Sequence, residues 1–135
     1  ENDAVHLEGN RAALINVWRP IVGPVQDHPL AICDARSAVP GDFLPTAIMH
    51  YSEDDLDSPS LTGEIYSFQH NPTHRWYYVS DMQTDEVMVL KCYDSEKNGR
   101  MSRWSFHTAF RDDTAPEDAP DRKNIVVRAY VFFRD

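Results

Sequence analysis

Short apolar runs separated by turn-forming residues follow one another along the chain from residue 12 onward. The run at 64–70 alternates, so that Tyr66 and Phe68 share one face and the residues between them share the other, which is typical of a β-strand. Other runs are rich in β-branched and aromatic residues, which favour strands. The pattern predicts strands at 12–19, 30–33, 45–51, 64–70, 75–79 and 87–93, and in two further runs within 101–133.

Proline, glycine and asparagine mark the breaks between these runs. Asn98-Gly99 supplies residues that tolerate a positive φ, so 94–99 is predicted to be a hairpin loop. Residues 1–10 resemble the end of a helix, with Gly9-Asn10 as its C-cap. The sequence therefore predicts an all-β sandwich or barrel with a short N-terminal helical tail.

Length and composition fit one folded domain spanning 1–135, because 41% of the residues are hydrophobic and 11% are aromatic. The net charge is −9 and the isoelectric point is about 5.0. Phosphate binding needs a basic stripe, and none is visible, so nucleic acid is excluded as a partner. The acidic runs 53–57 and 112–121 are interpreted as solvated loops.

The two cysteines, Cys33 and Cys92, match no metal or redox spacing and favour a reduced, cytoplasmic protein, although one disulfide stays open. No apolar run is long enough to span a membrane, and no signal peptide is visible. The chain begins with Glu1 rather than methionine, so it could be a processed or trimmed piece of something longer.

Two basic residues interrupt the apolar runs near the end of the chain. His107 lies in the run that begins at 101, and Arg128 lies in the run that ends at 133. A basic side chain in a run that favours burial needs a partner, because burying an unpaired charge is costly. From the residues alone, His107 fits a hydrogen-bonded core position better than a ligand, and Arg128 fits a pair with an acidic residue.

Six ordered blocks resemble a family of non-haem iron, 2-oxoglutarate-dependent oxygenases, the CmcJ-like or gibberellin-desaturase-like group. The resemblance extends from about Leu14 to the end of the chain. The blocks are I-N-V-W-R-P-I (15–21), G-P-V-Q-D-H-P-L-A-I-C-D-A-R-S (23–37), H-N-P-T-H-R-W-Y-Y-V-S-D-M (70–82), D-E-V-M-V-L-K-C-Y-D-S (85–95), F-H-T-A-F (106–110) and the A-P-E-D-A-P loop that leads to V-R-A (127–129).

The resemblance implies a double-stranded β-helix, a jelly-roll or cupin-like barrel. It implies an oxygenase, a hydroxylase or desaturase, that uses Fe(II), 2-oxoglutarate and dioxygen on a small-molecule secondary metabolite. The implied metal set is an H-x-D pair plus a distal histidine, and His107 matches the distal histidine. No H-x-D occurs in the chain, so a missing N-terminal segment or a second chain is expected to supply it. The H-x-E at His6-Leu7-Glu8 lies too far downstream to be that pair.

The far carboxylate of 2-oxoglutarate needs a cation, and the planar fork of arginine suits it. Arg128, one strand after His107, is the first candidate for this role. Arg19 is the main competitor, because it lies at a strand end between aromatic and proline neighbours, and Arg122 ranks third as a loop residue.

Three further residues are candidates for the substrate pocket. Tyr77 and Tyr78 point to opposite faces of their strand, so that one lines the pocket and the other the core. Lys91 interrupts an apolar strand and points into the pocket, pairs with Asp94 or lies exposed. His74 is expected to be structural or exposed, and Trp18 and Trp76 are expected to be core residues. The alternative function is a non-catalytic jelly roll that binds a small molecule or a protein.

Overall fold

The computed structural model describes residues 10–55, 57–58 and 61–133, which divide between two compact units. One unit is formed by Glu1–Ala35 with Trp76–Asp135, and the other by Arg36–Arg75. The predicted helical tail, with His6 and Glu8, lies outside the described residues. The prediction of one continuous domain stays a prediction.

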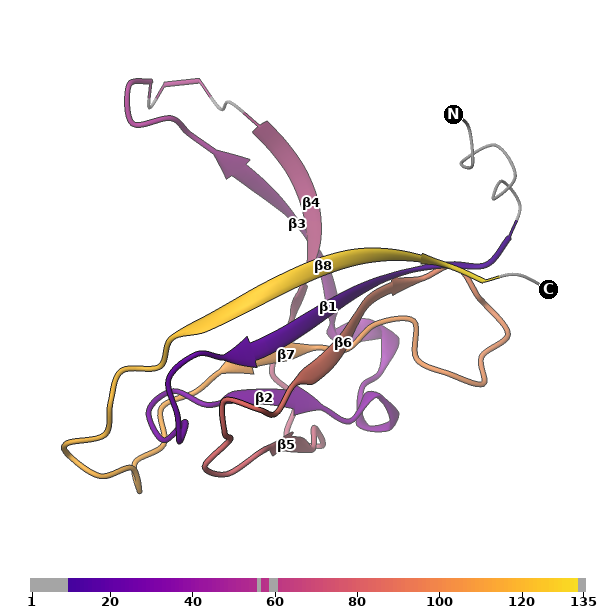
Figure 1. Ribbon diagram of the computed structural model, residues 1–135. Helices are drawn as coiled ribbons and strands as arrows, with labels where there is room; N and C mark the ends of the chain where they lie inside the picture. Colours follow the sequence, from indigo (N-terminus) through magenta and orange to yellow (C-terminus); the bar gives the residue numbers. More distant parts are fainter. Residues whose placement is uncertain (1–9, 56, 59–60, 134–135) are drawn as a thin grey trace. The chain divides into compact units, whose positions relative to one another are not determined.

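The first sheet of the larger unit has three antiparallel strands in the order β6-β1-β8. They are β1 (Ala12–Pro20), β6 (Met88–Asp94) and β8 (Asn124–Phe132), and they run side by side in Figure 1. The register of β1 against β6 shifts between Leu14 and Ile15, whereas β1 and β8 pair without a shift along their length.

The second sheet is shorter and has the order β5-β2-β7. It contains β2 (Leu30–Cys33), β5 (Trp76–Tyr78) and β7 (His107–Ala109), all antiparallel. In this unit, β1 and β2, β5 and β6, β6 and β7, and β7 and β8 follow one another in the sequence yet lie in different sheets. In particular β7 pairs with β2 while β8 pairs with β1, so Arg128 is not on the strand beside His107.

The core lies between the two sheets. Trp18 and Leu90 of the first sheet form one buried cluster with Leu30 of the second, and Ile32 packs against it. The cluster also contains Val25, Met82 and Met88. Because side chains alternate along a strand, these contacts identify the inner face of each sheet.

The smaller unit is built on a two-stranded antiparallel ribbon, β3 (Phe43–His50) and β4 (Leu61–Phe68). The 3-10 turns η2 (Ala35–Ser37) and η3 (Pro40–Asp42) precede it. His74 stacks on Phe68 and contacts the Asp42 carboxylate through Nε2 at 2.9 Å. The side chain of His74 is buried, so its predicted structural role is confirmed.

Eight strands form within the described residues, in the positions that the apolar runs predict. The hairpin predicted at 94–99 is wrong, because β6 does not pair with the strand that follows it. Within 101–110 only His107–Ala109 is a strand. Trp18 is buried as expected, but Trp76 is 40% exposed because it lies on the outer face of its sheet. No helix among the described residues is long and apolar enough to cross a membrane.

Candidate functional site

His107 begins β7 and lies on its inner face. It is the cross-strand partner of Ile32, which packs on the core, so both side chains lie on the face of the sheet that carries the core. The Nδ1 atom lies 2.8 Å from the backbone oxygen of Ser105. A carbonyl oxygen only accepts, so Nδ1 carries the hydrogen and Nε2 keeps a free lone pair. A backbone carbonyl in this position orients an imidazole for metal binding through Nε2.

The side chain of His107 is exposed, contrary to the expectation from its apolar run. The reason is its position: β7 forms an edge of its sheet among the described residues. Tyr77 lies on the same inner face, on the far side of Ile32. The structure therefore brings Tyr77 and His107 to one face of the β5-β2-β7 sheet.

Arg128 lies on the inner face of the opposite sheet. It is the cross-strand partner of Asn16, and its Nε donates to the Asn16 amide oxygen at 3.0 Å. The partner is thus a neutral amide, and Arg128 is exposed rather than buried. Cys92 lies close enough to Arg128 for the guanidinium charge to affect the pKa of its thiol. Burial raises the pKa of the Cys92 thiol, while the Arg128 charge lowers it.

The two competing arginines differ in orientation. Arg19 is offset by one residue from the inward-facing Trp18, so it lies on the outer face, where Nε donates to the Thr84 backbone oxygen at 2.5 Å. Arg122 places its guanidinium 5.9 Å from the centre of the Trp18 ring and donates through Nη1 to the His28 backbone oxygen at 2.6 Å. Its Nε is buried and has no acceptor among the described residues.

Lys91 is held by an ion pair. Its Nζ lies 2.8 Å from the Asp94 carboxylate and also donates to the Ser102 backbone oxygen at 3.2 Å. Asp94 is almost fully buried and accepts two hydrogen bonds from Arg11, at 3.0 and 2.7 Å. The Arg11 guanidinium holds the pKa of Asp94 well below its usual range, with Lys91 adding to the effect. The pairing of Lys91 with Asp94, one of its predicted alternatives, is confirmed.

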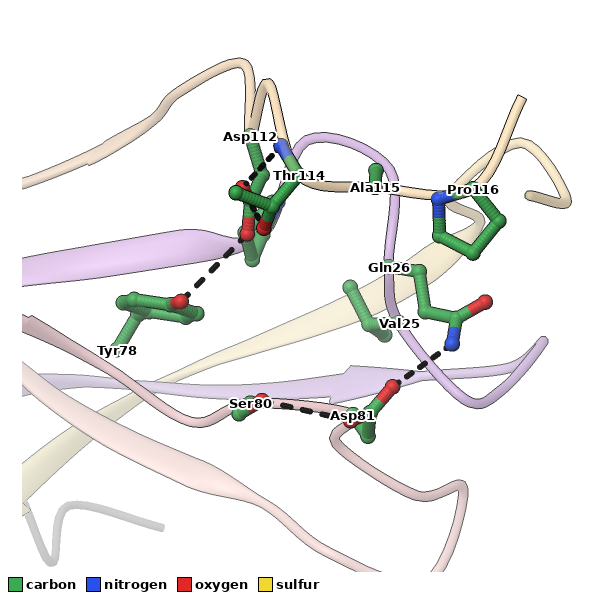
Figure 2. A pocket seen from close by; sticks show the side chains of 10 residues that line it. Val25, Gln26, Tyr78, Ser80, Asp81, Asp112, Thr114, Ala115 and Pro116 are labelled. Carbon is green, nitrogen blue, oxygen red and sulfur yellow. Dashed lines mark hydrogen bonds between the residues drawn. The ribbon is translucent and has the colours of Figure 1, made fainter.

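Tyr78 lies on the outer face of its sheet, away from His107. With Trp76, Thr108 and Phe110 it lines an open apolar hollow of about 410 Å³. It also borders a second, more polar hollow of about 270 Å³, shown in Figure 2. There its hydroxyl lies 3.5 Å from the Asp112 carboxylate.

The carboxylates of the second hollow have partners in the chain. Gln26 donates to Asp81 at 2.9 Å, and Thr114 donates to Asp112 through its hydroxyl at 2.6 Å and its N–H at 2.9 Å (Figure 2). The Thr114 hydrogen bonds lower the pKa of Asp112. This hollow contains no histidine and does not include the candidate metal ligand.

The chain's residues fit part of an iron and 2-oxoglutarate site. His107 offers a lone pair, and the inward-facing Arg128 and Arg122 offer guanidinium donors for a carboxylate. No group of three histidine, cysteine, aspartate or glutamate side chains that could hold a metal is found among the described residues. Sequence reasoning did not identify Asn16 or Ser105 as supporting residues. Asn16 could have been identified from the sequence, because it is a polar residue inside the apolar run of 12–19.

Comparison with known proteins finds relatives that are named as oxygenases. The chain is 40% identical over 130 residues to the Fe(II)/2-oxoglutarate-dependent dioxygenase nvfI of Aspergillus novofumigatus, covering 96% of the chain and 44% of the relative. It is 37% identical over 139 residues to the hydroxylase/desaturase asaB of Aspergillus flavus, covering 98% of the chain and 60% of the relative. The chain thus spans about half the length of the curated relatives it matches.

A solved structure has the same fold. The W199F variant of the iron and alpha-ketoglutarate-dependent endoperoxidase NvfI matches with a TM-score of 0.82 and 38% identity, covering 98% of this chain and 45% of that one. The predicted jelly roll and the resemblance read from the six sequence blocks are confirmed. A family profile described as the oxidoreductase/YMDC permease-like domain matches residues 1–132. The chain therefore belongs to this family of oxidoreductase-like domains.

Proposed function

We propose that this chain is part of an Fe(II)/2-oxoglutarate-dependent oxygenase, a hydroxylase or desaturase of a small-molecule secondary metabolite. The observation that carries the proposal is the His107 imidazole, whose Nδ1–H is held by Ser105 so that Nε2 is free to bind a metal. The names of the matched relatives support the same chemistry. When bound, iron and 2-oxoglutarate would use dioxygen to oxidise a C–H bond.

Arg128 is proposed to hold the far carboxylate of 2-oxoglutarate. Asn16 contacts only Nε, and the two terminal nitrogens have no hydrogen-bond partner among the described residues, so they are available for a bidentate contact. Arg19 is a weaker candidate than the sequence suggested, since it belongs to the outer face. Arg122 becomes the second candidate, because its buried Nε lacks an acceptor among the described residues.

The edge of β7 that is unpaired within the described residues suggests where the other two metal ligands, the H-x-D pair, would be located. Cys33 N–H donates to Phe106 O at 2.9 Å and Phe110 N–H donates to Pro29 O at 3.3 Å. These bonds set the phase of the ladder, so the backbone groups of His107 point away from β2, toward the open edge. A strand that paired there would have its side chains about 5 Å from those of β7. An H-x-D pair on such a strand would place both ligands on one face.

The remaining assignments follow the same proposal. Tyr77 shares the face of His107 and is the chain's best candidate for a substrate contact. Lys91 and Tyr78 donate hydrogen bonds to the carboxylates of Asp94 and Asp112, respectively. Cys33 and Cys92 form no disulfide bond among the described residues, and reduced cysteines support the proposed cytoplasmic location.

Anaerobic titration of the full-length natural protein with Fe(II) and 2-oxoglutarate tests the proposal. We expect a visible charge-transfer absorption band that is lost in His107→Ala. Arg128→Ala should weaken 2-oxoglutarate binding by at least tenfold, because a charge-assisted bidentate contact is removed. Arg19→Ala is the matched control and should leave binding unchanged.

Other outcomes separate the alternatives. If Arg122→Ala weakens binding and Arg128→Ala does not, the carboxylate role passes to Arg122. A band that persists in His107→Ala would contradict the ligand assignment. A folded full-length protein that gives no band would favour the non-catalytic binding module.

A further inference from the structure

The outer face of the β5-β2-β7 sheet carries a group of exposed aromatic side chains. Trp76 and Tyr78 come from β5, and Phe110 follows the last residue of β7. The Tyr78 and Phe110 rings meet edge to face with their centres 5.0 Å apart, an arrangement that aromatic pairs prefer. Together with the buried Ala31 of the central strand, these residues line the open apolar hollow of about 410 Å³. The hollow therefore suits the apolar body of a ligand.

Tyr78 connects this hollow with the polar one of about 270 Å³ (Figure 2). Its ring lines the apolar hollow, and its hydroxyl lies beside Asp112, which lines the polar hollow together with Asp81. Asp112 comes from the loop after β7, and Asp81 comes from the loop after β5. An aromatic surface thus continues into a recess that has two carboxylates and, among the described residues that line it, no basic side chain.

The Asp112 carboxylate has one oxygen that is well satisfied and one that is not. Oδ1 accepts both hydrogen bonds from Thr114, whereas Oδ2 has only the Tyr78 hydroxyl, at 3.5 Å, within the part of the chain that the structure describes. Hydrogen bonds from a hydroxyl to an oxygen are usually about 2.7 Å long. Oδ2 can therefore accept a shorter bond from a stronger donor.

Asp81 repeats this arrangement on the other side of the recess. Its Oδ1 accepts from Gln26 at 2.9 Å, whereas the partner of Oδ2 among the described residues is the Ser80 hydroxyl at 3.4 Å. The recess thus presents two carboxylate oxygens that still have room for donors. A carboxylate accepts most strongly from a positively charged N–H group.

The charge around the recess also favours a cation. The chain has a net charge of −9, and the Thr114 hydrogen bonds keep Asp112 ionised by lowering its pKa. The basic residue next to Asp112 in the sequence is Arg111, and its Nε lies 3.4 Å from Asp113 instead. An acidic recess with aromatic walls attracts cations from solution.

We propose that this surface binds a small primary amine, with its apolar body against Tyr78 and Phe110 and its ammonium group at Asp112 and Asp81. A primary ammonium carries three N–H donors and no acceptor, which matches two carboxylate oxygens that lack a short bond. The hollows have the size of small-molecule sites, so the occupant is a small molecule rather than a folded partner.

The amine site goes beyond the proposed oxygenase function and requires neither iron nor 2-oxoglutarate. Tyr78 and Thr108 lie on one face of the sheet, and His107 lies on the other. The site would give the protein a second small-molecule contact, on the opposite face of the sheet that carries the candidate metal ligand.

Nuclear magnetic resonance titration of the full-length natural protein, without metal, tests the proposal. The probe is phenethylamine, and the reporters are the Trp76 indole N–H and the Tyr78 ring. We expect both signals to shift in a saturable way at neutral pH. Phenethyl alcohol keeps the ring and replaces the ammonium by a hydroxyl, so it should bind at least tenfold more weakly. Equal affinities for the two probes, or no shift with the amine, would overturn the proposal.

Two variants of the acidic loop identify the carboxylate. Asp112→Asn keeps an oxygen for the Thr114 hydrogen bonds but removes the charge, so phenethylamine should bind at least fivefold more weakly. Glu117→Gln removes the same charge from the same loop outside the hollow, and affinity should change less than twofold. Equal losses in the two variants would mean that the loop attracts amines only through its overall charge, which contradicts a built site.

A second pair of variants tests the aromatic wall. Tyr78→Leu should weaken phenethylamine binding at least fivefold, followed through Trp76, because the ring contact is lost. Tyr93→Leu replaces an equally exposed tyrosine of the other sheet and should leave affinity unchanged. Binding that persists in both Asp112→Asn and Tyr78→Leu would place the amine elsewhere. Because no iron is added, a failure of the oxygenase assignment would leave these outcomes unaffected.

Discussion

Asn16 and Arg128 are direct cross-strand partners, and the amide oxygen of Asn16 accepts a hydrogen bond from Arg128 Nε at 3.0 Å. Asn16 is 6% exposed, although it lies in a strand that is otherwise apolar on its inner face. Its buried amide fixes one side of the guanidinium, and the terminal nitrogens have no hydrogen-bond partner in the part of the chain that the structure describes. The pair therefore positions a cation on the inner face of the β6-β1-β8 sheet.

Replacing Asn16 should weaken cosubstrate binding without removing the charge that binds it. We expect Asn16→Ala in the full-length protein to lower 2-oxoglutarate affinity about fivefold, since one hydrogen bond is worth roughly 1 kcal/mol. Anaerobic titration measures the effect. Thr108→Val, on the outer face of β7, should leave affinity unchanged, and an equal loss in both variants would argue against positioning by Asn16.

The buried Asp94 carboxylate should be important for stability. Asp94→Ala leaves Arg11 and Lys91 without their shared partner, and breaking a buried ion pair in this way costs about 3 kcal/mol. Equilibrium unfolding in urea measures the loss. Asp113→Ala is the matched control, because the Arg111–Asp113 pair is exposed and such pairs contribute about 0–1 kcal/mol. Equal losses for the two variants would contradict the structural importance of Asp94.

Asp42 should make the smaller unit sensitive to acid. The Val39 N–H, His74 and Asn71 lower the pKa of Asp42 from its ordinary 3.8 to about 2. A carboxyl with a lowered folded-state pKa stabilises above its unfolded pKa, and this contribution is lost as the pH falls through the folded value. We expect the stability difference between the native protein and Asp42→Asn to be constant above about pH 5 and to shrink from about pH 4 to pH 2.

Carbon-detected NMR titration of the Asp42 carboxyl provides a direct check on the same point. A midpoint near the ordinary value of 3.8 would show that the three hydrogen bonds do not favour the ionised form. His74→Phe should move the midpoint upward, because it removes one donor and keeps the aromatic stacking on Phe68.

Strand positions could be predicted from the sequence because each apolar run is local. The pairing partners of the strands could not be predicted from the sequence. For example, the loop between β6 and β7 resembles a hairpin loop, but the two strands lie in different sheets. His107 was identified through its sequence block, but its exposure depends on the edge position of β7. The orientation of Arg19 depends on the alternation set by Trp18, which only the burial of that ring reveals.

Turn chemistry was predictable where backbone conformation restricts the residue type. Gly99 has φ +74°, as the Asn98-Gly99 pair indicated, even though the loop does not close a hairpin. A positive φ is favoured locally by the glycine residue type, which can be read from the sequence. The pairing of the flanking strands follows from tertiary packing, which a dipeptide does not encode.

Substituting two glycines should isolate the cost of backbone strain, because neither site is crowded. Gly99 and Gly41 both have open space where a Cβ would stand, but only Gly99 has a positive φ. Gly99→Ala should destabilise the protein by about 1 kcal/mol, because alanine is strained in the left-handed region. Gly41→Ala should be neutral or slightly stabilising, since alanine restricts the unfolded chain without strain in the folded one. Urea unfolding of both variants measures the difference, and a Gly99→Ala protein as stable as Gly41→Ala would mean that the loop adopts a negative φ at residue 99 in solution.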